Sequence, residues 1–146
     1  MPREGMVHAL TAARRLLRPH GMLVDLRSDR FAHVRARHDQ VYCLAGRRRF
    51  HAGPLKINRP LADFRAADRA IREVVRRGLF RHTASDFFEI RSYAAGPAEL
   101  ERYAITNPYA TVDATTLRRL RNLLRRHPGA RILVVTLSRL TVLEKA

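Results

Sequence analysis

The chain has 146 residues, 46% of them hydrophobic, which suits one globular domain with a buried core and is too few for two ordinary domains. Lysine and arginine total 29 against 13 acidic residues, so the formal net charge is +16. The first ten residues lack the apolar run of a secretory signal, and the longest strongly apolar run, residues 132–137, is too short to span a bilayer. Cys43 is the one cysteine, which excludes an intrachain disulfide and a cysteine-based zinc site. We therefore expect a cytoplasmic protein without a transmembrane segment.

The excess of positive charge is almost entirely arginine. Lys56 and Lys145 are the only lysines, so 27 of the 29 basic residues are arginine. A GC-rich genome favours arginine codons over lysine codons, but that bias does not explain why acidic residues are so few. A charge excess of this size attracts polyanions and carries no information about the fold. Nucleic acid, acidic lipid surfaces and acidic proteins all stay open as partners.

The first half of the chain predicts a helix, a strand and a hairpin. Residues 5–18 form the helix, because Met6, Leu10 and Leu17 fall on one face at about 100° per residue. Pro19 and Gly21 end it, and residues 22–26 follow as a strand whose continuous apolar run indicates cover on both faces. A β-hairpin is expected at 31–51, with strands at 31–37 and 40–46, a turn at 38–39 and a short third strand at 48–51. Residues 52–60 contain two prolines and are expected to form a loop.

The second half predicts three helices and two strands. Asp63 is the expected N-cap of a helix at 64–77, with Gly78 at its C′ position. An aromatic-rich strand follows at 81–93, then a short helix that begins near Pro97. Residues 105–112 are expected to form a loop, and Asp113 is the expected N-cap of a helix that ends at about His127. A last strand at 131–143 closes the chain.

Three segments occur in a recognisable order. Residues 15–21, Arg-Leu-Leu-Arg-Pro-His-Gly, end a helix and enter the strand at 22–26. Residues 70–88 end a helix in a Gly-Leu-Phe turn and enter an aromatic strand, and residues 132–146 form the last strand. Together they resemble the C-terminal half of class I S-adenosylmethionine-dependent methyltransferases, where a helix ending close to Arg-hydrophobic-Leu-x-Pro-Gly-Gly enters the fifth strand of the sheet. His20 stands where that family usually has its first glycine.

The resemblance implies an α/β (α+β) fold in a single methyltransferase-like domain, residues 1–146. Its partial Rossmann-like sheet would have three core strands, with about four helices and a β-hairpin inserted at about 28–60. The strands at 22–26, 81–93 and 131–143 would be the fifth, sixth and seventh of the family. There the fifth strand pairs with the fourth and the seventh, and no fourth strand precedes residue 22. The strand at 22–26 would then present an unpaired edge, which we expect the hairpin, a second copy in a two-fold dimer, or a partner chain to cover.

The cofactor site of these enzymes depends on a Gly-rich loop after the first strand and an acidic residue at the end of the second. All seven glycines of this chain are isolated, and no Gly-x-Gly occurs. The resemblance thus implies a methyltransferase-like protein, truncated relative to the family, that binds no cofactor by itself and has no assignable catalytic residue. It would be a non-catalytic binding or assembly module, or a fragment completed by another chain, and any enzyme activity would be methyl transfer from S-adenosylmethionine. A misplaced start codon, and a basic nucleic-acid or polyanion-binding protein, are the open alternatives.

Arginines supply the candidate polyanion-binding residues. One set follows one flank of the helix at 64–77, where i,i+4 pairs with acids favour an ordinary solvated face: Arg65, Arg69, Arg72 and Arg76. A second set lies beside Phe50 and suits phosphate contact with base stacking, or equally a protected hairpin edge: Arg47, Arg48 and Arg49. The helix after Asp113 has five more arginines. They would add to a binding surface only if folding places them on the same side of the molecule as the other arginines.

The remaining polar groups give weaker predictions. Asp25 ends the strand at 22–26 on the edge where open α/β sheets bind ligands, although organising the turn with Arg27 and Ser28 is the preferred interpretation. His33 and His38 would project to opposite faces of one strand, which argues against a shared metal. A cluster on the strand at 81–93, of His82, Ser85 and Asp86, is too compact in sequence for a catalytic triad. No metal site is predicted.

Overall fold

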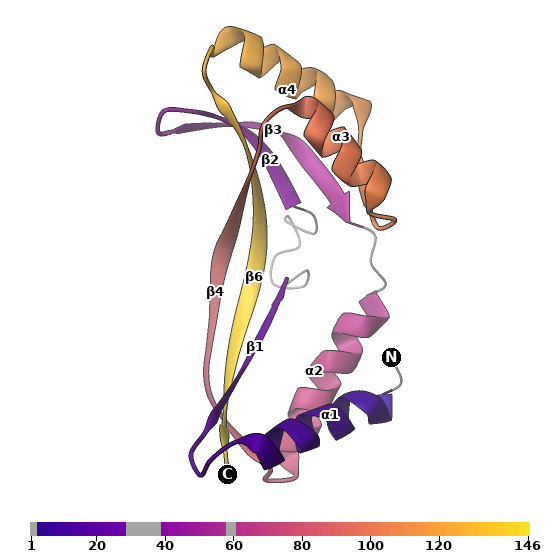
Figure 1. Ribbon diagram of the computed structural model, residues 1–146, viewed down its shortest axis with the longest axis vertical. Helices are drawn as coiled ribbons and strands as arrows, with labels where there is room; N and C mark the ends of the chain where they lie inside the picture. The colour runs from indigo at the N-terminus through magenta and orange to yellow at the C-terminus, as the bar shows by residue number, and fades with distance from the viewer. Residues whose placement is uncertain (1–2, 29–38, 58–60) are drawn as a thin grey trace. The chain divides into compact units, whose positions relative to one another are not determined.

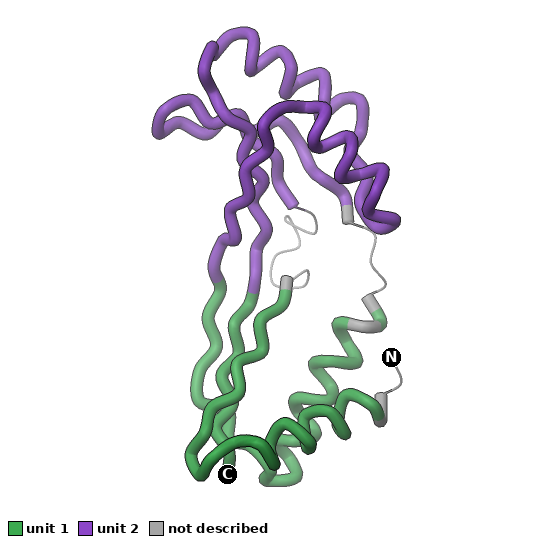
Figure 2. The backbone as a smooth tube through the Cα atoms, viewed as in Figure 1, with its two compact units in different colours: residues 1–27, 60–87, 139–146 green, residues 28–59, 88–138 purple. Residues whose placement is uncertain are grey.

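The computed structural model describes residues 3–28, 39–57 and 61–146. These residues form four helices and six strands, which confirms the predicted mixed α/β class (Figure 1). The chain divides into two compact units, residues 1–27, 60–87 and 139–146 in unit 1 and residues 28–59 and 88–138 in unit 2 (Figure 2). The strands follow the order β1-β6-β2-β3-β5, with β4 also paired to β6.

Unit 1 contains α1 (Arg3–Leu16), β1 (Met22–Ser28), α2 (Leu61–Arg76), the first half of β4 (Phe80–Ala94) and the end of β6 (Arg131–Lys145). Its core is formed by Val74, Phe80 and Leu143, against which Leu10 and Leu23 pack. Apolar residues of both helices therefore meet the strands at this core. The turn between α1 and β1 is tight, because the N–H of Gly21 donates to the carbonyl of Arg18 at 2.9 Å.

β1 is covered on one face only. Leu23 packs against the core of unit 1, whereas Met22, Val24 and Leu26 on the opposite face are 66%, 56% and 52% exposed. Side chains alternate between the faces of a strand, so every second residue of the apolar run points outward. The prediction that β1 is buried on both faces is therefore wrong for the single chain.

Unit 2 contains β2 (Asp39–Ala45), β3 (Arg48–Ile57), α3 (Pro97–Thr106), β5 (Ala110–Val112), α4 (Ala114–Arg126) and the remaining parts of β4 and β6. β2 pairs antiparallel with β3 and with β6, and β3 pairs antiparallel with β5. Its core includes Val41, Leu55, Leu100, Leu120 and Ile132, which come from strands and from both helices. α4 lies along β3, so it has one buried face and one face in solvent.

The described hairpin joins the second and third predicted strands, at 40–46 and 48–51, which form β2 and β3. Asp39 begins β2 and does not form a turn, and the turn of the hairpin is at Gly46 and Arg47. The predicted loop at 52–60 is wrong over 52–57, because β3 continues to Ile57 by pairing with β5. Pro54 is tolerated there beside an irregularity in the β2–β3 register, which is where strands accommodate proline. The predicted strand at 31–37, with His33 and His38, lies outside the described residues.

Several local signals are confirmed. Asp113 caps α4, its carboxylate accepting from the N–H of Thr116 at 2.7 Å. Gly78 follows α2 with a φ of 65°, the left-handed conformation that favours glycine. Asp63 is not an N-cap, since α2 begins at Leu61. None of the helices in the described ranges has the length and apolarity that crossing a membrane requires.

Candidate functional site

The solvent face of α4 is an arginine surface. Its sequence, ATTLRRLRNLLRR, contains five arginines and no acidic residue. At 100° per residue the five fall within an arc of about 160°, and all are exposed: Arg118, Arg119, Arg121, Arg125 and Arg126. Leu120 is buried on the opposite side of the helix. We call these five residues the α4 arginine face.

Few acidic groups neutralise the α4 arginine face. Arg121 pairs with Glu101 of α3 at 2.5 Å, and Arg125 donates to the amide oxygen of Asn122. Across the described residues of unit 2, no other ion pair reaches this helix. A shallow groove along the face is lined by Ala114, Arg118, Arg121, Asn122, Leu124 and Arg125. The surface therefore combines positive charge with a concave shape.

The hairpin turn adds arginines at the C-terminal end of α4. His127 caps that helix and stacks on Phe50 of β3, with the ring centroids 4.3 Å apart and the planes inclined by 18°. Phe50 is two residues from Arg48 and three from Arg47, so this contact joins the strand that follows the exposed turn to the C-cap of α4. Arg49 is less available, because it pairs with Glu89 of β4 at 3.1 Å.

Arg131 at the start of β6 belongs to the same end of unit 2. It is opposite Leu44 in the β2–β6 ladder, and Leu44 is in turn opposite Arg49. The guanidinium of Arg131 lies 4.7 Å from the centroid of the Tyr93 ring, within cation–π range. The sequence around Arg131 did not indicate that this residue belongs to the arginine surface, because the strands that surround it come from distant parts of the chain.

The predicted stripe of arginines on α2 is present in the structure, but the same helix also contains acidic residues. All four of its arginines are exposed: Arg65, Arg69, Arg72 and Arg76. Glu73 accepts hydrogen bonds from Arg76 and Arg77 at 2.7 Å each, and these bonds lower the pKa of the Glu73 carboxyl to about 2. The stripe is part of unit 1, whereas Arg47, Arg48, Arg49 and the α4 arginine face are part of unit 2.

Asp25 takes part in an ion cluster inside unit 1. It lies within β1, which continues to Ser28, so its predicted place at the strand end is wrong. The predicted partnership with Arg27 is confirmed, with Nε of Arg27 at 2.7 Å from the carboxylate. Arg27 also bonds Asp68 of α2 at 2.8 Å, and Arg139 of β6 bonds the same carboxylate. The cluster joins two strands to one helix, so we interpret it as a part of the fold and not as a binding site.

Comparison with known proteins gives no match. No protein-family model matches the chain, and neither a curated protein nor a solved structure matches it. The surfaces of the molecule are therefore the grounds on which its function can be inferred.

The described residues assemble little that resembles an enzyme centre. His82 and Ser85 do form a hydrogen bond of 2.8 Å on exposed β4, but the Asp86 carboxylate accepts from the N–H of Phe87. The prediction that these residues do not form a triad agrees with that geometry. No group of three His, Cys, Asp or Glu residues within the described ranges is placed to hold a metal ion. Burial raises the pKa of the Cys43 thiol, which disfavours the thiolate form that nucleophilic chemistry needs.

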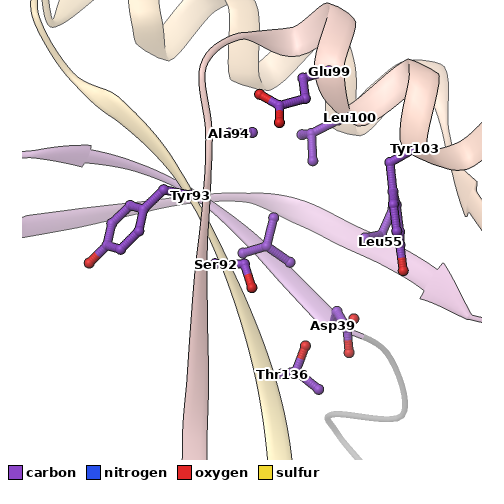
Figure 3. Close-up of a pocket in the computed structure, with 10 residues that line it drawn as sticks. Asp39, Leu55, Ser92, Tyr93, Ala94, Glu99, Leu100, Tyr103 and Thr136 are labelled. Atoms are coloured by element: carbon purple, nitrogen blue, oxygen red, sulfur yellow. The ribbon is translucent and has the colours of Figure 1, made fainter.

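A cavity of about 230 Å³ lies between the sheet of unit 2 and α3 (Figure 3). Asp39, Ser92 and Thr136 line it from the strands, and Glu99 and Tyr103 line it from α3. The polar groups of α3 are already engaged, since Glu99 accepts from the N–H of Ala95 at 2.6 Å and the Tyr103 hydroxyl accepts from Asn107 at 2.9 Å. These bonds hold the start and the end of α3, so both polar side chains that α3 contributes to the cavity are engaged within their own segment.

Proposed function

We propose that this chain is a non-catalytic binding module whose ligand is a polyanion such as nucleic acid. The observation that carries the proposal is the α4 arginine face, five exposed arginines on one helix that has no acidic residue. Arginine presents a planar fork of donors that matches phosphate oxygens, so a row of arginines suits a phosphate backbone better than isolated charges do. The formal net charge of +16 adds long-range attraction to the same ligand.

The surroundings of α4 extend this surface. His127 at the end of α4 stacks on Phe50 of β3, the strand that Arg48 begins and that Arg47 precedes in the hairpin turn. A backbone that follows α4 would meet the hairpin turn at its C-terminal end. The arginines at that end also interact favourably with the negative end of the helix dipole. They therefore stabilise α4 even when no ligand is bound. That stabilisation accounts for Arg125 and Arg126, but not for Arg118 and Arg119 in the middle of the helix.

The first test is a salt titration of binding to a labelled DNA duplex of ~20 base pairs, followed by fluorescence anisotropy between about 50 and about 200 mM salt. We expect affinity to fall steeply, with a logarithmic slope of about −0.9 for each phosphate contacted. Replacing Arg118, Arg125 and Arg126 with glutamine removes three contacts, so the slope should decrease in magnitude by about 2.7 and the affinity by tenfold or more, roughly. None of these arginines is paired with an acid in the described chain, so the fold should persist.

The matched control replaces Arg65, Arg69 and Arg72 of α2 with glutamine. This variant loses the same three charges from another exposed helix. If both variants lose affinity equally, binding follows net charge alone and the α4 arginine face is not the site. A flat response to salt by the unmodified protein would contradict polyanion binding altogether.

A second candidate function is assembly with another chain as a methyltransferase-like module. What supports it is the pairing of β1 with β6, the pairing that the resemblance assigns to the fifth and seventh strands, together with the exposed row Met22, Val24 and Leu26. Within the described residues β1 pairs with β6 alone, and β2 of the hairpin pairs with β3 and β6. A partner chain that supplies a neighbouring strand would cover both the edge and the apolar row.

Calorimetry with S-adenosylmethionine tests that candidate. We expect no binding heat from this chain alone, because its isolated glycines provide no loop through which backbone could approach the cofactor closely. Saturable binding at one cofactor per chain would show that a complete site exists here, and the reading as an incomplete module would be abandoned.

A further inference from the structure

β4 is a long exposed strand that neither proposed function uses. It has 15 residues, and every residue from Arg81 to Tyr93 is exposed. Four large hydrophobic side chains on it reach solvent, with exposed fractions of 47%, 37%, 40% and 51%: Phe87, Phe88, Ile90 and Tyr93. Among the described residues β4 pairs only with β6, so its other edge is open. Open apolar edges pair with further strands unless charge or cover prevents it.

A second copy of β4 can pair with the first only in certain registers. Directly opposite residues of an antiparallel pair project to the same face of the sheet. A two-fold axis perpendicular to the sheet leaves each side chain on the same face of the sheet. Because opposite residues must share a face, one residue must lie directly opposite its own copy, and the axis passes between these two. Each possible register is therefore defined by the residue that lies at the axis. Each can be checked for opposite charges and for apolar side chains that meet across the pair.

The register centred on Ile90 is self-complementary. Ile90 then lies opposite Ile90 of the second copy, and Glu89 lies opposite Arg91 twice, once on each side of the axis. Phe87 lies opposite Tyr93, also twice. Glu89 and Arg91 share a face, as their ion pair of 3.2 Å within the strand shows. Opposite charges and aromatic pairs across strands are each favourable, and the two-fold axis doubles both.

Neighbouring registers lack this match. An axis through Glu89 places two carboxylates opposite each other. An axis through Phe88 places Phe87 opposite Glu89 and leaves Arg91 opposite Ser85, so no opposite charges meet. An axis through Ser85 also places Arg81 opposite Glu89 twice, but it sets Phe87 against Thr83 and Phe88 against His82, so no two of the exposed hydrophobic side chains meet. Among these registers, the one centred on Ile90 combines opposite charges with the Phe87–Tyr93 pairs, which is evidence for a second copy as the occupant of this edge.

We infer that two copies of this chain form a two-fold dimer by antiparallel pairing of β4 with β4, centred on Ile90. The dimer extends each sheet through the strand pair and covers the apolar side chains around the axis. It is independent of the α4 arginine face and of the β1 edge. Because both copies are strongly basic, salt screens the repulsion between them, so the dimer should persist at salt concentrations that abolish polyanion binding.

Cross-linking tests the register. Opposite Cα atoms in an antiparallel pair are about 4.5–5.5 Å apart, within the range that a disulfide bridges. Ile90→Cys should therefore form an interchain disulfide under mild oxidation, whereas Cys43 is buried and should stay reduced. The matched control is Ser92→Cys, on the same strand and exposed. In the inferred register the two copies of residue 92 are about 13 Å apart along the strand, too far for a disulfide.

Charge reversal tests the pairing without a cross-link. Arg91→Glu places two carboxylates opposite each other on both sides of the axis, and the dimer dissociation constant from sedimentation should rise about tenfold or more. The double variant Glu89→Arg with Arg91→Glu restores two opposite-charge pairs and should restore the dimer. A monomer at high protein concentration, equal cross-linking by Ser92→Cys, or no recovery in the double variant would each overturn the inference. Binding of DNA at β4, seen as protection of Ile90→Cys by the duplex in a protein that stays monomeric, would overturn it as well.

Discussion

Replacing Gly53 with alanine should destabilise the protein by about 3 kcal/mol or more, because the substitution combines backbone strain with a steric clash. Gly53 has a φ of 151°, which side-chain-bearing residues rarely adopt. A Cβ atom there would lie 2.2 Å from Oγ1 of Thr116 and 3.0 Å from its Cβ. Thr116 is itself buried in the first turn of α4, so it has little room to move.

Urea unfolding followed by circular dichroism measures this loss, and two further variants separate its causes. Gly46→Ala has a positive φ of 59° but nothing within 4 Å of the new Cβ, so it should cost only about 1 kcal/mol of conformational strain. Adding Thr116→Ala to Gly53→Ala removes the Oγ1 contact, and a double-mutant cycle should show a favourable coupling between the two substitutions. If Gly53→Ala and Gly46→Ala cost the same, β3 and α4 are not in close contact at Gly53.

The same position shows what the sequence could not reveal about the fold. Periodicity and capping residues located α4, α3 and β4 closely, because Asp113, Pro97 and the alternating aromatic residues act through local geometry. Residues 52–57 were predicted as a loop, since Gly53 and Pro54 disfavour a strand locally. Their strand forms because β3 gains pairing with β5 and packing against α4, and those partners are about 60 residues away. Contacts at that separation leave no local pattern.

The candidate binding surfaces also depend partly on local patterns, which the sequence shows, and partly on contacts between distant segments, which it does not show. The five arginines of α4 are visible in the sequence and share one face because a helix has 3.6 residues per turn. Their proximity to Arg47 and Arg48 depends on the stacking of His127 on Phe50, which no spacing in the sequence indicates. The stripe on α2 was equally visible as a pattern, but Glu73 on the same helix pairs with Arg76 of the stripe and with neighbouring Arg77, whereas α4 contains no acidic residue.

The ion cluster of unit 1 leads to the second large expected effect. Asp68→Asn keeps the size of the side chain but removes the charge that Arg27 and Arg139 share. All three side chains are at least 73% buried, since their exposed fractions are 22%, 16% and 27%, so solvent replaces the lost interaction only in part. We expect a loss of about 2 kcal/mol in the free energy of unfolding, lower than for a fully buried cluster.

Glu73→Gln is the matched control for that substitution. It removes the same charge from the same helix, and the Glu73 side chain is as exposed as that of Asp68, but its partners Arg76 and Arg77 are 72% and 53% exposed, so solvent replaces the lost pairs. Its midpoint in urea should therefore stay close to that of the unmodified protein, while the midpoint of Asp68→Asn falls. Equal shifts would mean that both substitutions act through the net charge of the chain. A fall confined to Asp68→Asn would show that β1, β6 and α2 depend on one carboxylate, which is 41 and 71 residues from its two arginine partners in the sequence.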